Sequence, residues 1–377
     1  MLPEIESKSL PDDPSPPRHK HIPALQSVRG LAALVVLLNH ALFVFATSPG
    51  FRYGSEAALN AHAAVVLFFV LSGYVLSRSL SGAHISIDVC WRFYVRRVFR
   101  VYPAALLSVM AGLAYVLTIR EHFATPNVSH WFIAEYTGVK FDLKSVIQNI
   151  TILKSSYMPI MGTIKIEIEG SILLPFLWML TKGPRGIFLL LFTGAICVGV
   201  GRINPMLEYG FSFALGAWCF RHGQTLADWA RKPWFGLIAL VVLLFFRRIN
   251  SGWNFETDYT APLPTAVETL AAGALILFVV NAKAGVAWLE AKPIVALGDV
   301  SYSIYLFHFP IMSALSTWLV FDLLPVDGSA LLLAPMTLGL TALLSWVTYR
   351  YVELPGIAAG RAFLDRAVRL RVKPEVS

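Results

Sequence analysis

The chain has 377 residues, of which 56% are hydrophobic and 14% charged, whereas soluble domains have roughly 45–50% apolar and about 25% charged residues. This composition excludes a soluble globular protein. The formal net charge of +8 fits membrane orientation and contact with anionic lipid better than binding to nucleic acid. The three cysteines form no C-x-x-C pair, so neither a disulfide framework nor a metal site is indicated. We expect an all-α polytopic membrane protein.

The chain divides into three parts. Residues 1–21 are polar and proline-rich and lack an apolar core, which predicts a disordered tail and no signal peptide. Residues 22–356 contain apolar stretches close to the roughly 20 residues that span a bilayer, and we expect one transmembrane domain there. Residues 357–377 mix arginines with apolar residues, which indicates an amphipathic, basic tail at the membrane surface. The ten expected spans are about 29–47, 59–78, 100–119, 160–181, 186–201, 205–220, 233–247, 264–282, 300–322 and 329–350.

The distribution of positive charge predicts the orientation of these spans. An even number of spans places both termini on one side of the membrane. Of the 31 Lys and Arg residues, 22 fall on that side, 8 on the opposite side, and one, Lys165, within a span. Because the positively charged loops of membrane proteins face the cytoplasm, we expect both termini to be cytoplasmic.

Ionisable residues are costly inside a membrane span, and we single out three of those in the expected spans as functional candidates. They are His40 in the first span, Glu167 in the fourth and His308 in the ninth. A neutral imidazole is well suited to act as a general base near neutral pH. Each residue also has a structural interpretation: His40 can join two helices by a hydrogen bond, and Glu167 can pair with Lys165 or Arg29. For His308 we favour the structural interpretation.

A run of arginines, WRFYVRRVFRVYP at 91–103, begins before the third span. Positions 92, 96 and 100 follow i, i+4, i+8 spacing, which predicts one stripe of guanidinium groups on a helix. Guanidinium groups bind phosphate oxygens in a bidentate manner, so the stripe could hold the phosphates of a nucleotide-like ligand. The alternative is an anchor on anionic lipid at the cytoplasmic surface.

Two small residues lie at the cytoplasmic end of the second span. Ser72 and Gly73 occur in the string FFVLSGYVLSR. Small residues let helices approach closely, and they also let a ligand approach the backbone. Taken singly, close packing of helices is the favoured interpretation.

The order and spacing of these features resemble the membrane acyltransferase-3 family, whose members modify cell-surface and secreted glycans with acetyl or other short acyl groups. The resemblance extends from the first span to the last. The fifth to eighth spans resemble the family only in their apolar character, without a matching string. The matching strings are RGLAALVVLLNH at 29–40, FFVLSGYVL at 68–76, FRVYP at 99–103, TIKIEIEGSILLP at 163–175, LGDVSYSIYLFHFPI at 297–311 and RYVELP at 350–355.

The resemblance implies roles for individual residues. One departure occurs at Gly162, where the family often has Trp at the start of its W-[ST]-L-x-x-E motif; this departure bears on local packing or on the shape of the acceptor site. The implied assignments are Arg29 and His40 as the first-span Arg and catalytic His, Ser72 and Gly73 as the SG[FY] motif, Arg97 and Arg100 as the R-x-x-R pair that meets the acyl donor, and Glu167 as the fourth-span acidic residue.

With this resemblance, we expect an integral inner-membrane O-acyltransferase that carries an acyl group, in the first place acetyl, from cytoplasmic acyl-CoA to a carbohydrate acceptor. Arg96, Arg97 and Arg100 would hold the adenosine phosphates of acyl-CoA. His40 would deprotonate a sugar hydroxyl that enters from outside, and Glu167 would orient its imidazole. Direct transfer and an acyl-histidine intermediate both stay open.

A different class of protein also fits these residues. In a proton-coupled transporter or flippase, His40, Glu167 and His308 would form a proton relay. The sequence has no visible inverted repeat of the kind many transporters carry, which argues against that class. The acceptor, the acyl chain and the oligomeric state stay open.

Overall fold

The computed structural model describes residues 22–82, 84–118, 127–252, 261–282, 285–318 and 325–372. These residues fold into helices, and no named strand occurs among them. The expected all-α fold is therefore confirmed, while the predicted tail at 1–21 lies outside the described residues.

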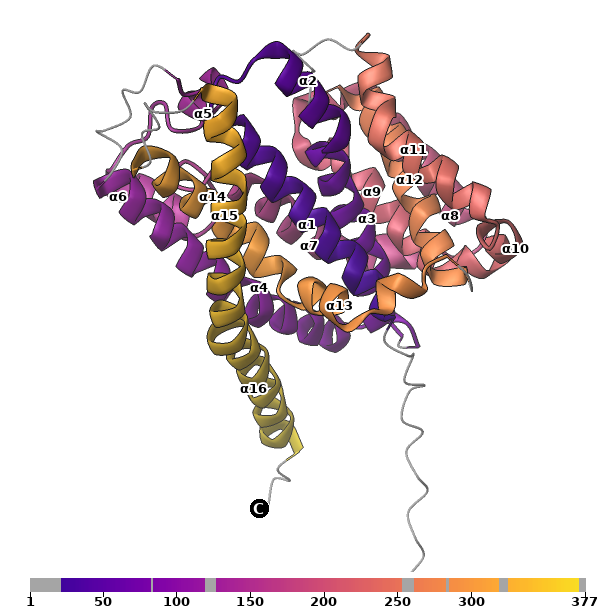
Figure 1. The fold of residues 1–377 in the computed structure, drawn as a ribbon. Coiled ribbons are helices and arrows are strands. Elements are labelled where there is room, and N and C mark those ends of the chain that lie inside the picture. The colour runs from indigo at the N-terminus through magenta and orange to yellow at the C-terminus, as the bar shows by residue number, and fades with distance from the viewer. Residues whose placement is uncertain are drawn as a thin grey trace, which may run out of the picture.

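Each expected span coincides with one helix of at least sixteen residues (Figure 1). Shorter helices connect the long ones on both ends of the bundle. The long helices are α1 (Pro23–Phe43), α3 (Ala61–Leu80), α4 (Ile87–Thr118), α7 (Met161–Leu180), α8 (Arg185–Val200), α9 (Pro205–His222), α11 (Pro233–Asn250), α12 (Pro262–Asn281), α14 (Ser301–Trp318) and α15 (Val326–Thr348), and the others are α2 (Pro49–Ala58), α5 (His130–Glu135), α6 (Leu143–Ile150), α10 (Ala227–Ala230), α13 (Lys292–Asp299) and α16 (Leu354–Val372).

The helices start at residues that suit a helix N-terminus. Ser48, Asn60, Ser129 and Asp142 accept a backbone N–H from the first turn of α2, α3, α5 and α6, respectively. Such caps satisfy donors that have no partner inside the helix. The polar residues between apolar stretches therefore define where the elements begin.

Seven helices among the described residues are long and apolar enough to cross a membrane, or eight if the bent pair α13 and α14 is one span. α7 and α9 fall outside this set, and both carry charged residues. α9 is nevertheless enclosed by α3, α7, α8 and α12. The polytopic membrane protein that composition predicts is confirmed, and α9 lies in the interior of the bundle.

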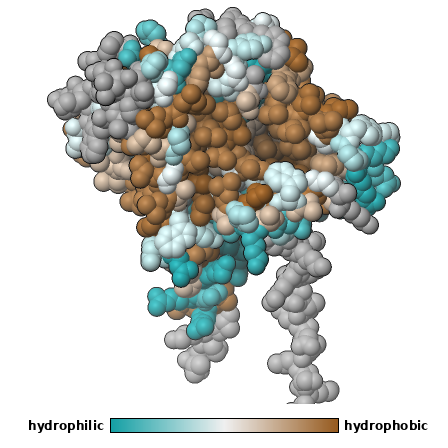
Figure 2. Space-filling model, in the orientation of Figure 1, coloured by the Kyte–Doolittle hydropathy of each residue, from teal (hydrophilic) through white to brown (hydrophobic). Residues whose placement is uncertain are grey.

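A band of hydrophobic side chains covers the face of the bundle that Figure 2 shows. Large apolar side chains are exposed here over a wider continuous area than the surface of a soluble monomer usually shows. The band therefore marks the surface that faces lipid. Its members include Phe188, Leu191 and Phe192 of α8, Leu237 and Ile238 of α11, and Leu343 and Trp346 of α15.

α3 and α9 pack more closely than ordinary side chains allow. A Cβ added at Gly73 would lie 2.4 Å from the carbonyl oxygen of Phe213, and one added at Gly216 would lie 2.1 Å from that of Val70. Glycine at facing positions lets two backbones touch. This contact fixes the position of α3 relative to α9, and with it the positions of Ser72 on α3 and Arg221 on α9.

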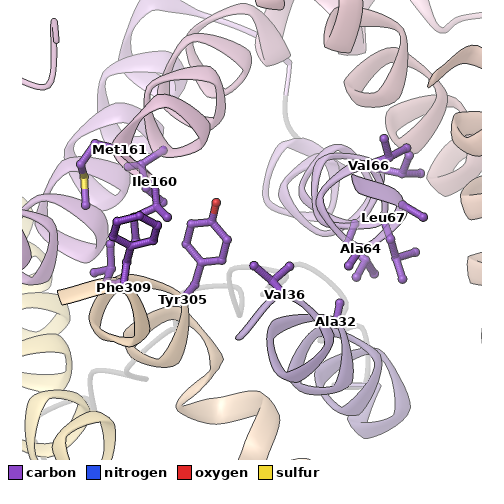
Figure 3. Close-up of a cluster of buried hydrophobic side chains, with 14 of the residues drawn as sticks. Ala32, Val36, Ala64, Val66, Leu67, Ile160, Met161, Tyr305 and Phe309 are labelled. Carbon is purple, nitrogen blue, oxygen red and sulfur yellow. The ribbon is translucent and has the colours of Figure 1, made fainter. Parts of the chain in front are cut away.

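The segment between α4 and α7 folds back onto the bundle. The side chains of Phe132, Tyr136 and Tyr157 are buried; the Tyr136 hydroxyl lies 2.9 Å from the Ser313 hydroxyl, and that of Tyr157 donates to the carbonyl of Lys140. These aromatic rings belong to the core, which places α5 against α14. Figure 3 shows the adjoining core, in which Tyr305 and Phe309 of α14 lie beside Ile160 and Met161, and Ala32 and Val36 of α1 lie across from Ala64 and Leu67 of α3.

The last helices form one continuous rod. α15 passes through a π-helical turn, Tyr349–Glu353, into α16 without a break (Figure 1). α16 packs on α4, where the rings of Phe99 and Phe363 are 5.8 Å apart. The expected domain boundary at residue 356 therefore falls inside a helix, and the basic tail as far as Val372 extends from the bundle and contacts the arginine-bearing part of α4.

Candidate functional site

A cavity of about 920 Å³ lies among α1, α3, α4, α7, α9 and α14. Six arginine side chains line it, and Glu167 is the one carboxylate among its described lining residues. This excess of guanidinium groups favours a ligand with several negative charges. We call it the arginine cavity, and its arginines are Arg29, Arg78, Arg96, Arg97, Arg100 and Arg221.

Arg97 and Glu167 form the ion pair in the wall of this cavity. Arg97 Nη2 lies 2.8 Å from Glu167 Oε1 and 3.0 Å from Ser171 Oγ, and Ser72 Oγ is 3.5 Å from Glu167 Oε1. Arg97 Nε is buried and has no hydrogen-bond partner among the described residues. A buried donor without a partner is costly, so this N–H of Arg97 stands out among the groups of the wall.

Arg29 is held at the bend between α13 and α14. Its Nε donates to Ser301 Oγ at 2.7 Å, and its Nη2 donates to the Gly298 carbonyl at 3.3 Å. Arg100 and Glu167 are close enough to act on it electrostatically. The first-span arginine is thus a fixed part of the wall.

The predicted arginine stripe lies only partly in the wall of the arginine cavity. Arg92 Nε pairs with Asp88 Oδ2 at 2.6 Å, and Arg92 is absent from the lining of the arginine cavity. Arg96, Arg97 and Arg100 line it, because positions i, i+1 and i+4 share one side of a helix. Positions 92, 96 and 100 all lie on α4, as the spacing predicts, and two of these three arginines, Arg96 and Arg100, line the arginine cavity.

Ser72 and Gly73 face different directions. Ser72 lines the arginine cavity, whereas Gly73 faces the Phe213 carbonyl of α9. The missing Cβ of Gly73 serves the packing of two helices, and its assignment as a cofactor-binding residue stays a prediction. Ser72 keeps a position from which it can contact a ligand.

His40 forms a pair with His308 in the interior. His40 Nδ1 lies 3.0 Å from His308 Nε2, and the two rings are stacked with centroids 5.2 Å apart. The ring of Trp131 lies 5.3 Å from that of His40, and Phe309 meets it edge-on at 6.1 Å. His308 is fully buried, and His40 is partly so.

The hydrogen bonds determine the tautomers of the neutral pair. His308 Nδ1 lies 3.1 Å from the Ile304 carbonyl oxygen, which can only accept, so Nδ1 carries the proton of His308. His308 Nε2 then accepts a hydrogen bond from His40 Nδ1–H. His40 Nε2 is left unprotonated, with a lone pair that can take a proton from a substrate.

The partner of His40 is not the predicted one. We expected Glu167 to orient the imidazole, but the carboxylate of Glu167 binds Arg97, and His308 holds His40 Nδ1. His40 is not among the residues lining the arginine cavity. Tyr305 lines that cavity, and its ring is 5.7 Å from that of His308. The arginine cavity therefore ends next to the histidine pair.

A second set of ionisable side chains is buried between α3, α9, α11 and α12. Arg247 Nη2 lies 3.0 Å from Glu268 Oε2, and His62 Nδ1 lies 2.7 Å from the same oxygen. Arg248 pairs with Glu56. Arg247 and Arg248 both lie in α11 and form internal ion pairs.

The sequence profile of the acyltransferase-3 family, described as an acyltransferase domain, matches residues 22–350. The chain belongs to this family. An O-acetyl transferase of Shigella phage Sf6 is 22% identical to this acyltransferase over 334 residues, 85% of this chain and 92% of the phage protein. The O-acetyltransferase OatA of Staphylococcus aureus (strain NCTC 8325 / PS 47) is 23% identical over 380 residues, 89% of this chain and 57% of OatA.

A third relative matches over a shorter stretch. YrhL of Bacillus subtilis (strain 168) is 35% identical to this acyltransferase over 101 residues, 26% of this chain and 14% of YrhL. The chain therefore spans a small part of YrhL and about half of OatA, but nearly all of the phage protein. No solved structure matches the chain.

Two arginines of the site, Arg78 and Arg221, carry little signal in the sequence. Arg78 and Arg221 line the arginine cavity, and the guanidinium of Arg221 lies 3.6 Å above the ring of Trp178. The sequence offers one signal for Arg78, which follows Ser72 by six residues in the same string. Arg221 lies on α9, far along the chain, so only the fold brings it to this cavity.

Proposed function

We propose that this acyltransferase is an O-acyltransferase that carries an acyl group, in the first place acetyl, from acyl-CoA to a sugar hydroxyl. One observation carries the proposal: the arginine cavity ends beside the His40–His308 pair. The phosphates of CoA match a wall with six arginines. The thioester at the far end of the pantetheine arm then lies near a histidine with a free Nε2.

In this mechanism, Arg96, Arg97, Arg100 and Arg29 hold the phosphates of acyl-CoA at the end of the arginine cavity that we take to be cytoplasmic. Arg29 and His40 are eleven residues apart on α1, or roughly 16 Å at about 1.5 Å per residue. The donor therefore has to extend along α1 to reach the histidine pair.

The proton transfer follows from the tautomers. His40 Nε2 takes the proton of the acceptor hydroxyl, and the resulting alkoxide attacks the thioester carbonyl. The carbon–sulfur bond breaks, and the CoA thiolate takes the proton back from Nε2. His308 Nε2 accepts from His40 Nδ1–H throughout and stabilises the imidazolium that forms between these steps. In a relay, Nε2 would instead attack the thioester and carry the acyl group to the acceptor.

The test is acyl transfer in purified membranes supplied with labelled acetyl-CoA and a glycan acceptor. The wild-type protein should release free CoA and label the acceptor. His40→Ala should lower the rate by at least about 10²- to 10⁴-fold, the usual contribution of a general base, with expression and thermal stability retained. His84→Ala, a change at an exposed histidine, is the matched control and should keep full activity.

The same experiment separates the proposal from a transporter or flippase. A transporter would release no CoA from acetyl-CoA, and His40→Ala would then change only substrate movement. Full acceptor labelling by His40→Ala would exclude His40 as the base.

A further inference from the structure

A second cavity lies on the other side of α7. Its volume is about 540 Å³, within the range of roughly 300–1,000 Å³ that is typical of small-ligand sites. α5, the segment 153–159 and the first residues of α7 and α9 enclose it. We call it the mixed-charge cavity, because Glu135, Lys154, Lys165 and Glu169 all line it.

The wall between the two cavities is the first part of α7. Gly162 and Ile166 line the mixed-charge cavity, whereas Thr163 and Glu167 line the arginine cavity. Neighbouring residues of one helix therefore face two different cavities. α5 lies at the end of the bundle opposite α13 and α16 (Figure 1), so the mixed-charge cavity, which α5 lines, lies nearer that end.

α5 links the mixed-charge cavity to the histidine pair. Trp131 packs on His40 with a ring distance of 5.3 Å, and Glu135, one turn later on the same helix, lines the cavity. Burial raises the pKa of the Glu135 carboxyl, and a hydrogen bond from the Trp131 side chain opposes that rise. A ligand that contacts Glu135 is therefore one helical turn from the ring that covers the proposed base.

The charges of this cavity differ from those of the arginine cavity. Two lysines and two glutamates line it, so its formal charges cancel, and Lys165 Nζ lies 3.9 Å from Glu169 Oε1. Ser155 and Ser156 add hydroxyl groups. Such a wall offers many donors and acceptors without a net charge. It matches a ligand that is rich in hydroxyl groups and carries no net charge.

Gly162 leaves part of this space open. A Cβ added there would meet a single neighbouring atom, Ser155 Oγ at 3.8 Å, which is ordinary contact. A larger side chain at this position would project into the cavity. The glycine thus determines how much room a ligand has next to α7.

We propose that the mixed-charge cavity is the acceptor site and binds an uncharged, hydroxyl-rich sugar unit. The proposal rests on the proposed function, because it supplies the second substrate of the same transfer. The acceptor hydroxyl then approaches His40 past α5, while acyl-CoA approaches from the arginine cavity on the other side of α7.

Gly162→Trp tests the site directly, with Gly162→Ala as its matched control. The probes are chitotetraose and maltotetraose as neutral acceptors and a tetragalacturonate as a polyanionic one, with acetyl-CoA as donor. Gly162→Trp should weaken binding of the neutral tetrasaccharides and raise their KM by at least tenfold, while the Kd for acetyl-CoA stays within twofold of wild type. Gly162→Ala should stay within threefold of wild type in all these measurements.

A second variant, Lys165→Gln combined with Glu169→Gln, keeps the size of the wall and removes its ion pair. It should raise the KM for neutral acceptors about fivefold without changing the Kd for acetyl-CoA. Unchanged acceptor binding in both Gly162→Trp and the double variant would overturn the site. Failure of wild type to bind either neutral tetrasaccharide, or tighter binding of tetragalacturonate, would overturn the ligand class.

The outcomes separate this proposal from the proposed function. Suppose that wild type binds neutral acceptors and releases no CoA, and that Gly162→Trp abolishes this binding. Such a result would support the site and contradict acyl transfer. Acyl transfer that Gly162→Trp leaves unchanged would support the proposed function and contradict the site.

Discussion

At the scale of single residues, the function of His40 depends on which of its nitrogens carries the proton. His308 accepts from His40 Nδ1 because its own Nδ1 faces the Ile304 carbonyl. A leucine at 308 removes this acceptor, so the imidazole of His40 can turn over or change tautomer. We therefore class His308 as a positioning residue.

His308→Leu should lower kcat for acyl transfer by about 10- to 100-fold, the loss seen when the outer partner of a functional histidine is removed in metal sites. The Kd for acetyl-CoA should not change, because His308 does not line the arginine cavity. His308→Gln retains a carbonyl oxygen that can accept from His40 and should recover part of the rate. Equal losses in the Leu and Gln variants would contradict a hydrogen-bonding role and favour a packing one.

The sequence predicted the residue types of this site better than their partners. An ionisable residue in an apolar span is visible in the sequence, so His40, Glu167 and His308 all stand out there, although the sequence favours a structural interpretation for His308. Their pairing depends on which helices become neighbours, because His40 and His308 are 268 positions apart. The same holds for Arg221, which reaches the arginine cavity only because α9 packs on α3.

At the scale of elements, the contact between α3 and α9 holds the arginine cavity in shape. Gly73 faces the Phe213 carbonyl, and the neighbouring Ser72 lines the cavity. The SG pair therefore combines one residue for packing with one for the cavity wall. A Cβ at position 73 requires α3 and α9 to separate.

Gly73→Ala should destabilise the protein by roughly 1–3 kcal/mol, the usual cost of overpacking a tight contact, and thermal unfolding in detergent should show a lower Tm. Gly339→Ala in α15 is the control, because a Cβ there meets nothing within 4 Å; it should keep or raise the Tm, as Ala suits a helix interior better than Gly. An unchanged Tm for Gly73→Ala together with a raised KM for acetyl-CoA would support the ligand-binding assignment of Gly73.

The long helices could be predicted because an apolar stretch of about 20 residues has few other structures open to it. The short α2, α5 and α6 carry no comparable signal, and α5 and α6 both lie between the third and fourth expected spans. The continuation of α15 into α16 was missed for a different reason. Arginines among apolar residues predict a surface helix, and nothing local shows that α16 packs on Phe99 of α4.

At the scale of the whole molecule, the two cavities require a fixed orientation in the membrane. Cytoplasmic acyl-CoA can reach the arginine cavity only if that end of the bundle faces the cytoplasm. α1 begins and α16 ends toward this end (Figure 1), so the donor site and the two tails would share one side. The count of Lys and Arg residues predicts the same side for the termini.

Labelling of single cysteines in intact cells checks this orientation. Ser86 lies before α4 and Lys140 between α5 and α6, and both are exposed. In a chain whose native cysteines Cys90, Cys197 and Cys219 are replaced by serine, Lys140→Cys should react with a membrane-impermeant maleimide in intact cells. Ser86→Cys should react only after the cells are opened.

The two cysteines are each other's control, because both are solvent-exposed and differ in the end of the bundle at which they lie. The reverse pattern would turn the arginine cavity away from the cytoplasm. Acyl-CoA could then not be its ligand, because CoA and its thioesters are made and kept inside the cell, and the mixed-charge cavity would become the one that faces cytoplasmic substrates. The orientation therefore decides which of the two substrates each cavity can receive.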